Sequence, residues 1–269
     1  MKIISIIASF RNEEENINYF VKSIDQTFKR YKNIDYKILF INDFSLDSSE
    51  KKILSLKKKN KKILLASTKK NYGGSHSIQF GFDLIDKQSF ATVIDCDLQD
   101  PPNLLAKTFS EMNDNTLVHF VRKERKENLF QVFYTNIAYQ IINIISFGKI
   151  VKNSNYFKII PPYVVNDIKK SKEIYPYWNY FISKFSKKEK KIMYVRNNRK
   201  FGSSKFNIFS TNPWATFYSA LYYFLLNTYV FFLTLLFLNF LLFNMSNSIY
   251  LATILGLTFC AQCINLFVF

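Results

Sequence analysis

The C-terminal part of this sequence lacks charge altogether. No Lys, Arg, Asp or Glu occurs from Phe206 to Phe269, so all 37 basic and 20 acidic residues precede that point. A buried hairpin of a soluble domain is a poor explanation for an uncharged run of this length. The break therefore separates a basic region, residues 1–205, from an apolar tail rich in Phe and Leu.

Cysteine is scarce as well. The 269 residues include three cysteines, Cys96, Cys260 and Cys263, and their spacing does not suggest a disulfide framework. Cys260 and Cys263 lie within the apolar tail, where packing in a helix explains them better than redox or zinc chemistry. The sequence is therefore not that of a small disulfide-stapled domain.

Acidic residues are too few to balance the basic ones. The net charge of +17 indicates an anionic partner, which could be nucleic acid, an anionic membrane surface or a phosphorylated substrate. The apolar tail favours the membrane and the phosphorylated substrate. Nucleic acid is disfavoured, because no aromatic stacking platform accompanies the basic residues.

The tail has room for two membrane spans of about 20 residues each. We expect them at residues 222–243 and 248–269, preceded by an interfacial segment at residues 206–221 that contains Trp214 and Tyr218. Basic residues precede the first span and none lies between the spans. The positive-inside rule therefore predicts a multi-pass protein of the cytoplasmic membrane whose large domain, residues 1–205, faces the cytoplasm.

The first 205 residues alternate between strand and helix patterns. The N-terminal MKIISIIASF is followed at once by charged residues without a cleavage site, so we interpret it as a strand rather than a signal peptide. Strands are predicted at 2–9, 36–41, 62–67, 92–94, 117–121 and 190–195, and helices at 17–31, 50–59, 76–85, 103–112 and 130–147. Such alternation predicts an α/β fold with a mostly parallel sheet, whose ligand lies beyond the carboxyl ends of the strands.

The stretch ATVIDCDLQDPP, residues 91–102, is the centre of the candidate site. If extended geometry continues past the strand, Asp95, Asp97 and Gln99 share one side. Carboxylate and carbonyl oxygens suit Mg²⁺ or Mn²⁺. The alternative is a polar turn in which Asp100 caps the next helix. The stretch alone leaves both interpretations open.

Two basic segments follow. Arg122 and Arg125 come directly after a predicted strand, which favours anion binding about as much as a solvated surface. The segment from Arg196 to Lys205 contains Arg199 and a Phe-Gly-Ser-Ser run. Its donors and flexibility suit a phosphate clamp, and its place before the apolar tail also suits attraction to anionic lipid.

These landmarks, in this order, resemble glycosyltransferase family 2, and in particular its polyprenyl-phosphate glycosyltransferases. The matching pieces are SIIASFRNEEENI, INDFSLDSS, NYGGSHSIQFGF, DCDLQDPP, VRKERKENLFQVFY and RNNRKFGSSKF, followed by the two expected spans. The resemblance implies a Rossmann-like A-type domain that transfers one sugar, with inversion, from a UDP- or GDP-sugar to a polyprenyl phosphate such as undecaprenyl phosphate. The group resembles oligomeric membrane enzymes, which makes a homo-oligomer one possibility, but the sequence leaves the oligomeric state open.

The resemblance implies roles for particular residues. Asp43, Asp95 and Ser204 would bind the nucleotide-sugar donor, with Asp43 at the nucleobase. Asp95, Asp97 and Gln99 would bind Mg²⁺ or Mn²⁺. The residues expected to act on the reacting phosphates and sugar are Asp97, Arg122, Arg125, Arg199 and Lys205.

This sequence departs from the family pattern at three places. Ser9 stands where the first motif usually has Pro, and Asn42 and Phe44 replace the Asp and Gly of an Asp-Asp-Gly-Ser motif. Tyr156 stands where some members carry an acidic residue proposed as a base. A phosphate monoester has its second pKa near ~6, so the acceptor is already mostly a dianion at neutral pH and needs no base.

Two other functions remain open from the sequence. One is a family-2 transferase that acts on a glycan or a lipid diphosphate. The other is a catalytically degenerate membrane scaffold for polysaccharide assembly, which Asn42, Phe44 and Tyr156 motivate. The sequence does not identify the sugar of the donor. It does not identify the nucleobase either, because Asp43 can accept hydrogen bonds from uracil or guanine.

Overall fold

The computed structural model describes residues 1–123, 140, 143, 148–171 and 178–199. The strands are β1 (Lys2–Phe10), β2 (Ile34–Asn42), β3 (Ile63–Ser67), β4 (Phe90–Val93), β5 (Leu117–Arg122), β6 (Ser154–Ile159) and β7 (Glu189–Tyr194). The helices are α1 (Ile17–Phe28), α2 (Ser49–Lys59), α3 (Gly74–Leu84), α4 (Pro102–Glu111), α6 (Pro162–Ser171) and α7 (Trp178–Lys184).

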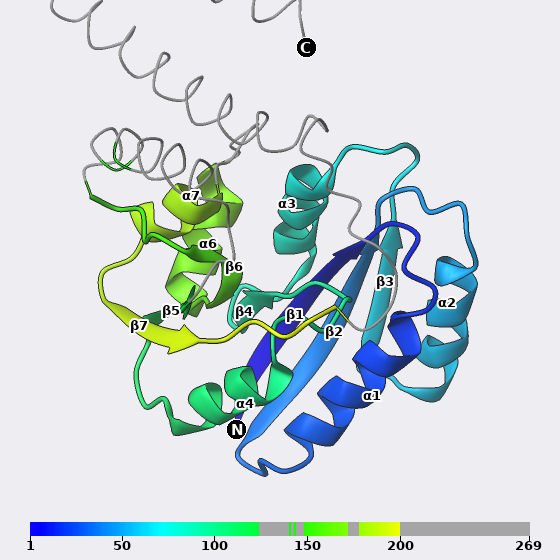
Figure 1. Ribbon diagram of the computed structural model, residues 1–269, viewed down its shortest axis with the longest axis horizontal. Helices are drawn as coiled ribbons and strands as arrows, with labels where there is room; N and C mark the ends of the chain where they lie inside the picture. The colour runs from blue at the N-terminus through cyan, green and yellow to red at the C-terminus, as the bar shows by residue number, and fades with distance from the viewer. Residues whose placement is uncertain (124–139, 141–142, 144–147, 172–177, 200–269) are drawn as a thin grey trace, which may run out of the picture. The chain divides into compact units, whose positions relative to one another are not determined.

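The main sheet has four parallel strands in the order β3-β2-β1-β4 (Figure 1). Strands β1, β2 and β4 are mostly buried on both faces, as expected where crossover helices cover a parallel sheet, whereas the edge strand β3 is more exposed. From β1 the chain adds β2 and then β3 on one side, and it then adds β4 on the other side of β1. The switch in strand order therefore lies between β1 and β4. The carboxyl ends of these central strands are where a ligand of an open α/β sheet binds.

A second sheet of three strands has the order β6-β5-β7. β5 pairs with β7 in parallel and with β6 in antiparallel orientation. An isolated bridge connects the two sheets, in which Ala91 and Ile160 exchange backbone hydrogen bonds of 2.9 and 2.8 Å. This bridge sets β6 beside β4, and thus beside the segment that follows β4.

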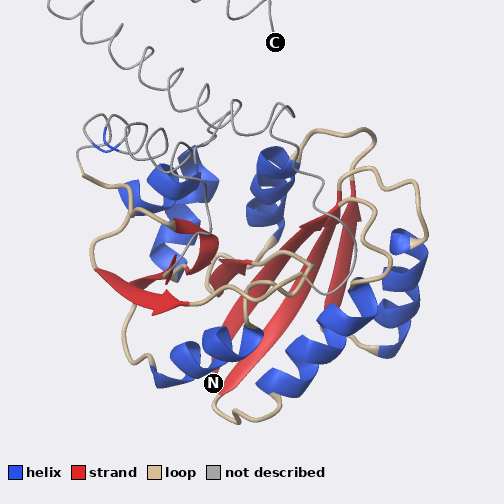
Figure 2. Cartoon of the chain, in the orientation of Figure 1, coloured by secondary structure: helices blue, strands red, loops and turns tan. Residues whose placement is uncertain are grey.

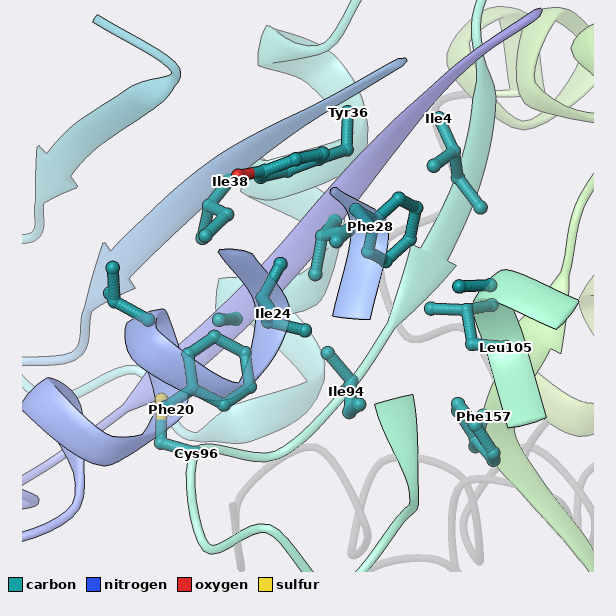
Figure 3. Close-up of a cluster of buried hydrophobic side chains, with 14 of the residues drawn as sticks. Ile4, Phe20, Ile24, Phe28, Tyr36, Ile38, Ile94, Cys96, Leu105 and Phe157 are labelled. Carbon is teal, nitrogen blue, oxygen red and sulfur yellow. The ribbon is translucent and has the colours of Figure 1, made fainter. Parts of the chain in front are cut away.

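One core lies between the main sheet and the helices α1, α2 and α4 (Figure 2). Along α1 the buried residues recur at helical spacing, and Phe20, Ile24 and Phe28 pack toward β1 and β2 (Figure 3). Cys96 lies in the same core and is 2% exposed. Burial raises the pKa of its thiol, so Cys96 is a packing residue rather than a nucleophile.

A second core covers the other face of the main sheet. Helices α3, α6 and α7 contribute to it, and the rings of Phe82 and Trp178 stack with centroids 5.0 Å apart. Helix α3 approaches β1 so closely that a Cβ atom on Gly81 would lie 2.5 Å from Ile7 Cγ2. The glycine therefore sets the distance between this helix and the sheet.

The predicted α/β class with a mostly parallel sheet is confirmed, and the predicted strands and helices in the described residues are present with shifted ends. Strand β6 and helices α6 and α7 were not predicted. The predicted extension of the fourth strand to Ile94 is wrong, because β4 ends at Val93.

Several predictions lie outside the described residues. These are the helix at 130–147 apart from residues 140 and 143, the interfacial segment at 206–221 and the two spans at 222–243 and 248–269. The described residues all belong to the compact unit Met1–Asn207. Within them, no helix is both long enough and apolar enough to cross a membrane.

Candidate functional site

The loops that follow β1 and β2 are joined to each other at the carboxyl edge of the main sheet. The amide of Asn12 donates to Ser45 Oγ at 3.0 Å, and that of Glu13 donates to Ser49 Oγ at 2.9 Å. In return, Asn12 Oδ1 accepts from the amide of Leu46 at 2.8 Å. These hydrogen bonds hold together two loops of the candidate site that are far apart in the sequence.

Asp43 organises the loop between β3 and α3. Its side chain is buried, and its two oxygens accept the amides of Tyr72 and Gly73 at 2.9 and 3.0 Å. Gly73 has a φ of 85°, a left-handed conformation that glycine adopts readily. The structure thus places Asp43 at the predicted edge and gives it a loop-holding role that sequence reasoning missed.

The segment after β4 carries the predicted acidic pair. Asp97 Oδ1 accepts from the amide of Gln99 at 3.1 Å, and Leu98 between them has a φ of 59°. The predicted alternation of Asp95, Asp97 and Gln99 on one side of an extended chain is therefore wrong. The strand ends before Asp95, and Leu98 turns the backbone into the left-handed region.

The electrostatics of Asp95 reflect its acidic neighbours. Desolvation raises the pKa of Asp95 to about 6, and the negative charges of Asp100 and Asp97 add to this effect. The Arg196 and Arg122 guanidinium groups oppose it. The side chain of Asp95 is nevertheless 51% exposed, so solvent can reach a site that concentrates negative charge. Such a site favours a bound cation.

Asp100 is the buried centre of a charged cluster. It is 1% exposed, and its Oδ1 accepts from Tyr194 Oη at 2.5 Å and from Arg196 Nε at 3.3 Å. Arg122 Nη2 lies 4.0 Å from the same oxygen. Asp100 does not cap α4, whose N-cap is Pro101. The predicted cap is therefore wrong, whereas a polar turn between β4 and α4 is present.

Residues 195–199, drawn in yellow after β7 in Figure 1, form a crossing segment over the end of β4. The amide of Asn197 donates to the carbonyl of Gln99 at 2.9 Å, and Gln99 Nε2 donates to the carbonyl of Asn197 at 3.3 Å. Arg199 Nη2 pairs with Glu13 Oε1 at 2.8 Å. The crossing segment therefore delivers two arginines to the acidic edge.

The structure brings together most of the predicted site residues. Asp43, Asp95, Asp97, Gln99 and Arg199 lie on loops that follow strands, as expected, and Arg122 is the last residue of β5. Arg125, Ser204 and Lys205 lie outside the described residues. Arg196 was predicted as part of the basic segment that suits a phosphate clamp, but its position 3.7 Å from Asp95 was not predicted.

Tyr156, which replaces an acidic residue of the family, lies on β6 and within electrostatic reach of Asp95. Burial raises the pKa of its phenol, and the negative charge of Asp95 adds to the effect, while a hydrogen bond with Ser75 opposes it. The phenol is thus protonated at neutral pH. Tyr156 can donate a hydrogen bond at this site but does not serve as a carboxylate base.

The side chains at this edge fit a hard divalent cation that is shared with a ligand. Among the described residues, no group of three or more His, Cys, Asp and Glu side chains is placed to enclose a metal ion. The donors are instead two carboxylates, Asp95 and Asp97, with the amide oxygen of Gln99 close in sequence. Mg²⁺ commonly binds one or two carboxylates together with substrate phosphates and water, so this donor set is sufficient.

The acidic pair and the arginines lie beyond the carboxyl ends of the parallel strands, which is where open α/β sheets bind their ligands. The sequence model described as "Glycosyl transferase family 2" matches residues 5–169. The chain therefore belongs to glycosyl transferase family 2, as its motifs predicted.

Curated relatives agree with this assignment. The prophage bactoprenol glucosyl transferase homolog of Escherichia coli K12 is 30% identical over 209 residues, which are 76% of this chain and 67% of that protein. The bactoprenol glucosyl transferase of Shigella phage SfX is 29% identical over 206 residues, or 76% of this chain and 67% of that protein. An uncharacterized glycosyltransferase of Synechocystis sp. is 25% identical over 76% of this chain. The chain spans 64% of the length of that relative.

Solved structures share the fold at low sequence identity. TarS 1-349 of S. aureus in complex with UDP-GlcNAc superposes with a TM-score of 0.53 at 13% identity, covering 84% of this chain and 66% of that one. Mannosyl-3-phosphoglycerate synthase of Rubrobacter xylanophilus gives a TM-score of 0.51 at 12% identity, covering 82% and 72%. These likenesses support the A-type glycosyltransferase fold.

Proposed function

We propose that this protein transfers a single sugar from a nucleoside diphosphate sugar to a polyprenyl phosphate at the membrane, with inversion at the anomeric carbon. The observation that carries the proposal is the charged edge of the sheet. Asp95 and Asp97 lie there beside Arg122 and Arg196, in a chain that belongs to glycosyl transferase family 2. This combination suits a reaction between two phosphate-bearing substrates.

Asp95, Asp97 and Gln99 are the residues that would hold Mg²⁺ or Mn²⁺. When bound, such a cation neutralises the charge that develops on the departing nucleoside diphosphate. The half-exposed carboxylate of Asp95 and its raised pKa support this assignment, since a cation relieves the repulsion from Asp97 and Asp100. Asp43 holds the loop at Tyr72 and Gly73, and we assign to that loop and Asp43 the base side of the donor.

The protein's own residues bind, orient and neutralise the substrates. Arg122 is well placed for an acceptor phosphate, because its Nη2 is buried without a hydrogen-bond partner among the described residues. Arg199 belongs to the crossing segment, which continues toward Ser204 and Lys205. We assign Arg199, Ser204 and Lys205, together with Arg125, to phosphate contacts. Two anions are brought together only where cations offset their repulsion, and this need accounts for the basic excess.

No general base is required in this proposal. The acceptor phosphate is mostly dianionic at neutral pH, and its oxygen attacks the anomeric carbon as the bond to the nucleoside diphosphate breaks. Tyr156 keeps its proton and lies within electrostatic reach of Asp95. We assign to it a hydrogen bond to a substrate oxygen, which a carboxylate in that place would not donate at neutral pH.

The lipid acceptor is supported by two observations. Relatives named bactoprenol glucosyl transferase match 76% of this chain, and the uncharged sequence after residue 205 has room for two membrane spans. Together they favour an undecaprenyl phosphate acceptor and a catalytic domain on the cytoplasmic side of the membrane.

An acceptor panel tests the proposal. Membranes that contain the full chain are incubated with radiolabelled UDP- and GDP-sugars and, separately, undecaprenyl phosphate, undecaprenyl diphosphate or a glycan. The expected product is an acid-labile lipid with one sugar and one phosphate, formed with the monophosphate alone. Transfer to the diphosphate or the glycan would replace the proposed acceptor, and no transfer from any donor would support a scaffold instead.

A further inference from the structure

Arg196 lies where a cation beside Asp95 is expected. Its Nη2 is 3.7 Å from Asp95 Oδ2, and its Nε is 3.3 Å from Asp100 Oδ1. Asp100 is 2% exposed at its side chain, whereas Asp95 is 51% exposed. One edge of the guanidinium is therefore anchored in the interior, while the other faces a carboxylate that solvent can reach.

The backbone around Arg196 is held in place. Asn197 exchanges two hydrogen bonds with Gln99, which follows the acidic pair, and Arg199 pairs with Glu13 after β1. The crossing segment thus fixes the Cα of Arg196 near Asp95, so the side chain can change partners without moving away. An arginine suits this position because its planar fork contacts two carboxylates at once, which a lysine ammonium does less well.

We propose that Arg196 is a positioning residue that neutralises Asp95 before the donor binds and releases it to the divalent cation that accompanies the nucleoside diphosphate. After this exchange Asp100 keeps the Arg196 guanidinium at the site. The guanidinium N–H groups that do not contact Asp100 then bind diphosphate oxygens. The inference rests on the proposed function, since it requires a cation at Asp95 and Asp97.

The exchange predicts opposite effects on two affinities. Without nucleotide, Arg196 competes with the metal ion, so Arg196→Gln tightens the binding of Mn²⁺ alone by about fivefold, the size that a partly exposed ion pair supports. With nucleotide, the same variant loses a phosphate contact, and binding of UDP or GDP at saturating Mn²⁺ weakens by about tenfold. A residue that only supported the fold would weaken both.

Calorimetry on the full chain in detergent tests this inference. Mn²⁺ is titrated alone, and then UDP and GDP are titrated at saturating Mn²⁺, into the wild type, Arg196→Gln, Arg196→Lys and Lys190→Gln. Lys190→Gln removes the same charge from an exposed position on β7 and is expected to change neither affinity. Arg196→Lys keeps the competing charge and is expected to restore the weak Mn²⁺ binding of the wild type.

The outcomes separate this inference from the proposed function. If Arg196→Gln leaves Mn²⁺ binding unchanged or weakens it, the exchange is wrong while a metal-dependent donor site stands. If Lys190→Gln tightens Mn²⁺ binding as much as Arg196→Gln does, the effect is one of net charge, which also overturns the inference. If the wild type binds neither nucleotide with Mn²⁺, the proposed function fails and this inference fails with it.

Discussion

Among the Asp, Glu, Lys and Arg side chains of the described residues, Asp100 and Lys158 are the most deeply buried. Asp100 is buried among arginine and tyrosine donors at the candidate site. Lys158 is 0% exposed on β6, with its Nζ 3.2 Å from His119 Nδ1 and 2.5 Å from Ser154 Oγ. Asp100 has cationic partners close by, whereas the opposite charge that acts on Lys158 is that of Glu189. The two groups therefore affect stability in different ways.

Lys158→Met is expected to remove a pH dependence of stability. Burial lowers the pKa of Lys158 from 10.5 to about 7, and the charge of Glu189 opposes this shift. Between these pH values the unfolded chain binds more protons than the folded chain, so the free energy of unfolding rises with pH, by up to about 1.4 kcal/mol per unit. Denaturation of the wild type and the variant in detergent at pH 7, 8 and 9 measures the difference. Parallel pH profiles for the two proteins would contradict the assignment.

Phe44→Gly is expected to stabilise the protein by about 1 kcal/mol. Phe44 has a φ of 58°, and glycine, the usual residue of the family motif here, adopts this conformation without the Cβ penalty. Its ring is 41% exposed, so little packing is lost. The control is Leu46→Gly in the same loop, at a residue that does not have a positive φ, which is expected to be neutral or destabilising. Equal changes in melting temperature for both variants would show that φ is not the cause.

Packing between elements is tightest where α3 crosses β1. Gly81→Ala places a methyl group 2.5 Å from Ile7 Cγ2, so we expect a loss of about 1–3 kcal/mol in the free energy of unfolding. Gly74→Ala is the matched control, because nothing lies within 4 Å of a Cβ atom at that position. Chemical denaturation compares the two variants. A Gly81→Ala protein as stable as the control would mean that α3 shifts freely on the sheet.

The elements also show what a sequence can and cannot predict. Apolar and β-branched patterns located the strands β1 to β5 and β7 and the helices α1 to α4, and the signal was clearest in elements such as α1, which buries a regular apolar stripe. Strand β6 was missed, since its buried Lys158 reads as a surface residue. The contact between Arg196 and Asp95 joins residues that are about a hundred positions apart, so no local pattern contains it.

Across the described part of the molecule, candidate site residues that are distant in the sequence lie at or just beyond the carboxyl ends of strands. Glu13, Asp43, the Asp95–Asp97 pair and Arg199 lie on the segments that follow β1, β2, β4 and β7, and Arg122 is the last residue of β5. The mostly parallel sheet followed from the alternation of strands and helices, whereas the order of the strands and the path of the crossing segment depend on tertiary contacts. The predicted membrane spans remain predictions, and they would bring a lipid acceptor to the same chain.

The transfer activity of an Asp97 variant tests the central claim most directly. Membranes with the wild type, Asp97→Asn or Asp114→Asn are supplied with a labelled nucleotide sugar, Mn²⁺ and undecaprenyl phosphate, and label in the lipid fraction is measured. Asp114 pairs with Lys188 at an exposed position away from the acidic pair, so its variant controls for the same change of charge. We expect Asp97→Asn to lose at least about a hundredfold in rate, because cation-assisted charge stabilisation is lost, while Asp114→Asn retains wild-type transfer. Full activity of Asp97→Asn would contradict the account.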